Sequence, residues 1–129
     1  MLTRADMIIY LRRYLRAALL VGFDMADVEE GAGGVVDKVL ERLKVKKADR
    51  ADVVLDGDKE QAAYALLDFY VSAALLPVLR ECNELHVVQL SIDAMTRVNE
   101  QSRRRTEAMG YRIPKGDMPD LTPPTGPTG

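Results

Sequence analysis

The chain has 129 residues, 47% of them apolar and 29% charged, which is the size and balance of one globular domain with its own core. Eighteen Lys and Arg against twenty Asp and Glu give a net charge of -2, which excludes the uniformly basic surface of a histone-like coat. One Cys and one His exclude a disulfide framework and zinc sites built from several Cys or His ligands.

The N-terminal third of the chain predicts two helices. Thr3 and Asp6 have the spacing of a helix cap, and the apolar residues that follow recur three and four apart, so we expect a first helix from Arg4 to Leu20. Asp27 and Glu30 repeat the capping pattern before a second apolar stripe. That stripe comprises Val35, Val36, Val39, Leu40 and Leu43.

Three glycines, Gly31, Gly33 and Gly34, interrupt the start of this second helix. Glycine destabilises a helix interior relative to alanine, and it also lets another backbone approach closely. The sequence leaves both interpretations open, a frayed first turn or a close approach.

The strongest element of the sequence follows a charged connecting segment, 45–57, with one short turn expected near Val53–Leu55. From Asp58, with Gln61 as a reciprocal cap, apolar residues cover more than one side of a helix that is expected to end near Arg80 or Cys82. This pattern predicts the central helix of the fold, kinked at Pro77.

The run Leu85–Leu90 is short and rich in β-branched residues, and it predicts an extended strand. Its partner is expected to be either Val53–Leu55 or the same strand of a neighbouring copy. Ser91 is then expected to cap a last helix, Ile92–Met109, that Gly110 ends.

The chain closes with a Pro-rich segment that has little to bury, so we expect a helical domain over 1–112 and an extended C-terminal arm over 113–129. A disordered tail is the alternative interpretation of the arm. The predicted fold class is therefore mainly α: a small bundle of about four helices around a long central helix, with one short extended segment and the Pro-rich arm.

No residue pattern predicts catalysis, a cofactor or a metal site. Cys82 and His86 are four apart and would share a helix face, but the expected strand breaks that geometry. The glycine cluster lacks the Gly-Lys-Ser/Thr of a phosphate loop, and Asp56-Gly57-Asp58 lacks the later ligands of a calcium loop. We expect a protein that is not an enzyme. No membrane span is expected either, since the uncharged run Val71–Leu79 is about half of the ~20 residues a span needs.

Two arginine clusters are the densest basic features of the sequence. One comprises Arg103, Arg104 and Arg105, and the other comprises Arg12, Arg13 and Arg16. Guanidinium groups suit phosphates and acidic protein surfaces, although a solvated helix face gives the same pattern.

The order and character of these elements resemble the head-tail connector, or adaptor, proteins of long-tailed bacteriophages over residues 3–112. The resemblance is carried by the small capped helix pair, the long helix that opens Asp58-Lys-Glu-Gln-Ala-Ala-Tyr-Ala-Leu-Leu-Asp-Phe-Tyr, the segment Leu85–Leu90, the charged last helix ending Ala108-Met-Gly-Tyr111, and the Pro-rich tail.

The resemblance implies a structural virion protein at the head-tail interface, made in the host cytoplasm. Such subunits form a ring, commonly twelve-fold, that binds beneath the portal, extends the DNA channel and contacts a head-completion or tail protein. By this resemblance the C-terminal arm binds the portal and the strand joins neighbouring subunits. The residues expected to contact the portal are Tyr111, Ile113, Pro114, Met118, Pro119, Leu121, Pro123 and Pro124. The residues expected to contact a neighbouring subunit are Leu85, Val87, Val88 and Leu90. A small helical protein-protein interaction module and a DNA-binding regulator remain the alternatives.

Overall fold

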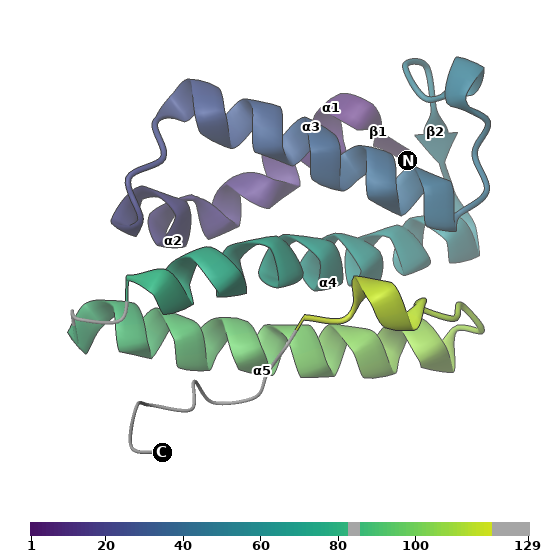
Figure 1. Cartoon of the computed structure of the whole chain (residues 1–129). Helices are drawn as coiled ribbons and strands as arrows, with labels where there is room; N and C mark the ends of the chain where they lie inside the picture. The colour runs from purple at the N-terminus through teal and green to yellow at the C-terminus, as the bar shows by residue number, and fades with distance from the viewer. Residues whose placement is uncertain (83–85, 120–129) are drawn as a thin grey trace.

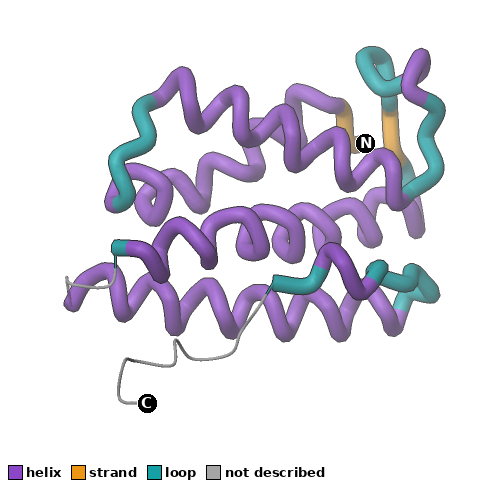
Figure 2. Tube along the Cα trace, viewed as in Figure 1, coloured by secondary structure: helices purple, strands orange, loops and turns teal. Residues whose placement is uncertain are grey.

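A computed structural model describes residues 1–82 and 86–119 and shows a mainly helical fold (Figures 1 and 2). The longest helix, α4, lies between α5 on one side and α1, α2 and α3 on the other. The predicted fold class, a small helical bundle around a long central helix, is confirmed. In chain order the elements are β1 (Leu2–Thr3), α1 (Arg4–Leu11), the 3-10 turn η1 (Arg12–Tyr14), α2 (Leu15–Leu20), α3 (Met25–Arg42), η2 (Lys47–Asp49), β2 (Val54–Leu55), α4 (Gly57–Glu81), α5 (His86–Ala108) and η3 (Lys115–Asp117).

The first helix begins where the sequence predicts. The Thr3 hydroxyl accepts the Asp6 backbone N–H at 3.2 Å, and the Asp6 carboxylate accepts the Thr3 N–H at 3.0 Å, which is a complete capping box. The helix then tightens into the 3-10 turn η1 before α2, and Gly22 follows its end with a φ of 90°.

Helix α3 begins earlier than predicted, because Asp24 rather than Asp27 is its cap. Asp24 accepts the Asp27 N–H at 2.9 Å, and Asp27 takes the reciprocal third position that the sequence pattern assigned to Glu30. Both aspartates have the capping spacing, and the earlier one adds a turn to the helix. Gly31, Gly33 and Gly34 therefore lie in the helix interior.

The two strands form a minimal antiparallel sheet at one end of the molecule, where Leu2 pairs with Leu55 and Thr3 with Val54 (Figure 2). Both leucine side chains are buried. The segment expected near Val53–Leu55 as a short turn thus ends in a strand, and its partner is the N-terminus rather than Leu85–Leu90.

The predicted strand Leu85–Leu90 is wrong for the residues that the structure describes, because His86–Leu90 form the first turns of α5. Ser91 lies within this helix and is not its cap. Val88, Ile92 and Met95 follow one another at four and three residues and are all buried, so packing on α4 overrides the β propensity of the valines. Leu85 lies outside the described residues.

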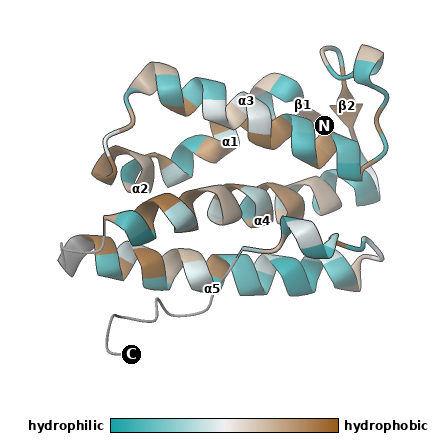
Figure 3. Cartoon of the chain, in the orientation of Figure 1, coloured by the Kyte–Doolittle hydropathy of each residue, from teal (hydrophilic) through white to brown (hydrophobic). Residues whose placement is uncertain are grey.

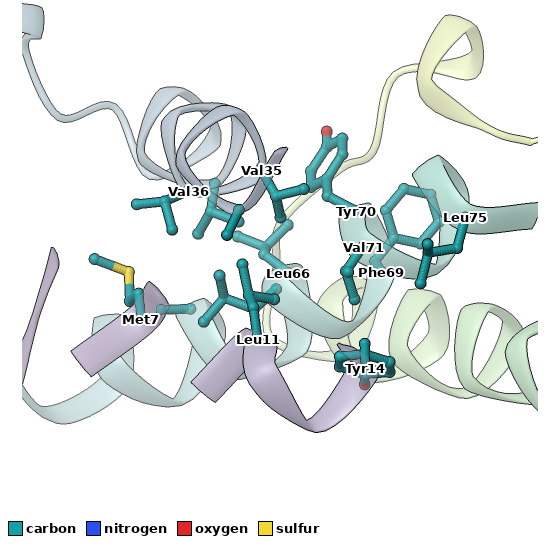
Figure 4. Close-up of a cluster of buried hydrophobic side chains, with 14 of the residues drawn as sticks. Met7, Leu11, Tyr14, Val35, Val36, Leu66, Phe69, Tyr70, Val71 and Leu75 are labelled. Atoms are coloured by element: carbon teal, nitrogen blue, oxygen red, sulfur yellow. The ribbon is translucent and has the colours of Figure 1, made fainter. Parts of the chain in front are cut away.

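Helix α4 is the hub of the hydrophobic core. Hydrophobic residues occur along α4 (Figure 3), and Figure 4 shows Leu66 of α4 among Met7 and Leu11 of α1 and Val35 and Val36 of α3. By length and composition α4 could also cross a membrane, but 72% of its most apolar window is buried inside the protein, as expected of a core helix. The helix continues through Pro77 to Glu81.

Candidate functional site

A buried carboxylate organises the polar groups between α1, α4 and α5. Asp68 of α4 is only 6% exposed, and three side chains from other elements donate to it. Tyr10 of α1 donates to Oδ1 at 2.8 Å, Tyr14 of η1 donates to the same oxygen, and Arg105 of α5 donates to Oδ2 at 2.8 Å. These donors satisfy a charge that would otherwise be costly to bury.

Both tyrosines are fixed as proton donors in this cluster. Burial, and then the hydrogen bond to Asp68, raise the pKa of Tyr14 well above the ordinary value for a phenol. The same two causes raise the pKa of Tyr10. Each phenol therefore stays protonated at neutral pH and presents its hydrogen to the carboxylate.

Tyr10 also positions an arginine. The Arg13 guanidinium donates to the Tyr10 hydroxyl oxygen at 2.9 Å, and its Cζ lies 4.9 Å from the centre of the same ring. Tyr10 thus links Arg13 to Asp68, and Asp68 holds Arg105. Arg13 of one cluster and Arg105 of the other are thus linked through Tyr10 and Asp68, and we call this arrangement the Arg13–Arg105 site.

The charge balance of the Arg13–Arg105 site suits an anion. Arg105 pairs with the Asp68 carboxylate, whereas Arg13 is linked to it only through Tyr10. One positive charge is therefore not matched within the site, and both arginines are exposed. A phosphate or a carboxylate of a partner is the chemical group that such a surface can bind.

The other predicted arginines do not join this site. Arg12 pairs with Glu29 of α3 at 3.3 Å, and Arg103 pairs with Glu107 along α5 at 3.4 Å. Arg16 and Arg104 are exposed. The two clusters are therefore not one continuous patch. Residue type alone could not distinguish the arginines that form local ion pairs from the two that are linked through Tyr10 and Asp68.

Sequence reasoning missed Asp68, Tyr10 and Tyr14. Asp68 carried a usable signal, because it is a charged residue in the middle of the apolar run Ala62–Val71. Its partners carried none, since their positions depend on how α1 and α5 cross α4.

The first residues of the predicted portal arm pack on the chain itself. Ile113 is 4% exposed and belongs to the core, and Tyr111 and Met118 pack against it. Pro114 and Pro119 are half-buried. Leu121, Pro123 and Pro124 lie outside the described residues. The helical body therefore extends beyond residue 112, and Ile113 is not exposed for a partner.

A hydrogen bond fastens this C-terminal segment to α4. The Tyr70 hydroxyl donates to Asp117 Oδ2 at 2.6 Å, while Lys38 of α3 lies 3.8 Å from the other carboxylate oxygen. Burial, and then this hydrogen bond, raise the pKa of Tyr70 well above its ordinary value. The bond fixes Asp117, two residues before Pro119, the last residue that the structure describes.

The residues predicted to join subunits as a strand have different roles in the helix. Val88 is fully buried against α4, while Leu90 is 56% exposed on α5. Leu85 and the side chain of Val87 are outside what the structure describes. An exchange of strands through Val88 is thus incompatible with this fold.

Over residues 1–82 and 86–119, no group of three His, Cys, Asp or Glu side chains could hold a metal ion. Comparison with models of known protein families, with curated proteins and with solved structures finds no match.

Proposed function

We propose that the chain is a head-tail connector subunit of a tailed bacteriophage, which forms a ring under the portal and extends the DNA channel. The observation that carries the proposal is the order of the elements: a capped helix pair, a long enclosed central helix, a charged last helix, and a C-terminal segment anchored to α4 at Asp117. This order agrees with the resemblance to the connector proteins except for the expected extended segment, of which His86–Leu90 are helical.

In this proposal the Arg13–Arg105 site contacts phosphates of the passing DNA or an acidic neighbouring subunit. Asp68 and Tyr10 restrict the two guanidinium groups before any partner binds, which lowers the entropy cost of an anion contact. The contact to the portal falls to residues beyond Ile113, because Ile113 is used in the core.

The direct test is composition of the particle. Virions from the source of the gene are analysed by mass spectrometry, and the neighbouring genes are sequenced. The proposal requires the chain in the particle and a portal gene nearby. A chain encoded in a cellular operon and absent from any particle would contradict it and leave a helical interaction module.

Portal binding is tested by truncation. A chain that ends at Pro119 keeps the Tyr70–Asp117 bond and the buried Ile113, so it is expected to fold while losing its affinity for the portal ring. Native mass spectrometry of mixtures with purified portal gives the stoichiometry. Unchanged binding by this truncated chain would remove the arm from the proposal.

A DNA-binding regulator is the second candidate, and the Arg13–Arg105 site is the observation in its favour. Exchange of Arg13 and Arg105 for Gln is compared with exchange of the exposed residues Lys46 and Lys47 for Gln, which changes the net charge by the same amount away from the site. A regulator binds a particular duplex selectively. We then expect only the arginine variant to reduce the slope of log binding constant against log salt concentration, by about one for each phosphate that the protein no longer neutralises. Weak binding to all sequences favours the connector.

A further inference from the structure

A groove runs between α3 and α4 beside the C-terminal segment. Gly31, Gly34 and Lys38 line it from α3, Ala73 and Ala74 line it from α4, and Asp117 lies at its end. Its volume is about 350 Å³. Its walls are mainly apolar, with one cation and one carboxylate at the edge.

The described fold does not account for the glycines of this groove. A Cβ atom built on Gly31 or on Gly34 would meet no described atom within 4 Å, apart from its own helix backbone and chain neighbours. Glycine destabilises a helix interior relative to alanine, and its usual benefit is the close approach of another backbone. The space above both glycines can admit an extended chain.

The end of the described chain lies at the same groove. Asp117 lines the groove and is held by Tyr70 at 2.6 Å, and Pro119 is the last described residue. Ten residues follow, Asp-Leu-Thr-Pro-Pro-Thr-Gly-Pro-Thr-Gly. Leu121 comes two residues after Pro119, within roughly 7 Å of extended chain. A segment tethered this closely has a high effective concentration at the groove.

The composition of this segment matches the groove. Leu121 is its only large apolar side chain, and Ala73 and Ala74 offer an apolar wall without bulk. Asp120 complements Lys38 in charge. Three prolines restrict the unbound segment, so that fixing it costs less entropy than fixing a Gly/Ser tail.

We propose that residues 120–129 dock in the α3–α4 groove of their own chain, with Leu121 against Ala73 and Ala74 and Asp120 beside Lys38. Docking of this segment does not depend on the connector proposal. In a connector, the segment would leave the groove when it binds the portal, so the groove would hold the arm of the free subunit.

The test compares amide and methyl NMR spectra of the full chain with those of a chain that ends at Pro119. Docking predicts chemical-shift differences concentrated at Gly31, Gly34, Ala73 and Ala74. A synthetic peptide of residues 120–129 added to the truncated chain restores the shifts. In the full chain, Leu121→Ala removes them.

A filled groove and a matched control complete the experiment. Gly34→Leu places a side chain in the groove and is expected to give the spectrum of the undocked segment while the fold persists. Ala26→Leu places the same leucine side chain at an exposed position of α3 outside the groove and is expected to leave the docking shifts intact.

Two results would overturn the proposal. One is the absence of shift differences at the groove residues between the full and the truncated chain. The other is a loss of the chemical-shift differences at the groove when the protein is diluted, with a simultaneous fall in the apparent mass measured by diffusion. That result would place the segment in the groove of a second copy.

Discussion

Arg105 of α5 donates to the Asp68 carboxylate of α4 at 2.8 Å, and Tyr10 of α1 and Tyr14 of η1 donate to the same carboxylate. This one buried carboxylate therefore connects three helical segments that apolar packing alone would allow to slide or rotate. Charged groups buried with good partners often fix one arrangement of a fold more than they add to its stability. The consequence can be measured at Asp68 itself.

Asp68→Ala is expected to lower the free energy of unfolding by about 3–5 kcal/mol, because it leaves the buried Tyr14 phenol without its acceptor and opens a cavity. Asp68→Asn keeps an oxygen acceptor and is expected to cost about 1–3 kcal/mol. Urea unfolding followed by circular dichroism gives both values. Equal losses for the two variants would show that the hydrogen bonds of Tyr10 and Tyr14 do not stabilise the fold.

High pH is expected to destabilise the protein through its buried tyrosines. Burial raises the pKa of Tyr14 and of Tyr70, so below the unfolded value of about 10 both states keep the proton and stability is unaffected. Above that value the unfolded chain loses protons that the folded chain keeps. Stability then falls as pH rises, by up to about 1.4 kcal/mol per pH unit for each tyrosine.

The measurement is urea unfolding at about pH 9 and about pH 11. Tyr14→Phe serves as the comparison, because it removes one of the titrating groups and keeps the ring. The variant is less stable at both values but loses less between them. Parallel losses in the two proteins would contradict the assignment of the pH effect to Tyr14.

The parts of the fold that the sequence predicted are those controlled by local signals. Thr3 with Asp6 marks the start of the first helix, and Gly110 ends the last. Where two local signals compete, the choice depends on packing that the sequence does not display. The valines before Leu90 have strand propensity, yet Val88 lies on the helical face that covers α4.

The sequence predicted the arginines of the candidate site but not their arrangement. The arginines were identifiable by residue type, but their meeting at Asp68 depends on long-range contacts between positions such as 10, 68 and 105. The Pro-rich composition likewise indicated an arm, and Ile113 showed no periodic pattern that could mark it as core. Only the crossing of the helices supplies this information.

Glycine substitutions in α3 are expected to stabilise the protein. In a chain that ends at Pro119, Gly34→Ala adds a methyl group into open space within a regular helix, so we expect a gain of about 0.5–1 kcal/mol. Gly110→Ala is the opposite control, because its φ of 91° strains any side chain, and a loss of about 1–2 kcal/mol is expected. Thermal unfolding separates the two directions. A loss of stability for Gly34→Ala in the truncated chain would contradict the open space above Gly34. A smaller gain in the full chain than in the truncated chain is expected if residues 120–129 occupy the groove.

The packing of Ile113 predicts that the chain depends on residues beyond the expected domain boundary. Ile113→Ala removes a side chain that is 4% exposed in the core and is expected to cost about 2–5 kcal/mol. A chain that ends at Tyr111 loses this side chain together with the Tyr70–Asp117 bond, so it is expected to be destabilised at least as much. A chain that ends at Pro119 keeps both and serves as the control. If the two truncated chains unfold at the same urea concentration, residues 112–119 contribute nothing to the stability of the body, and the anchor at Asp117 is not formed in solution.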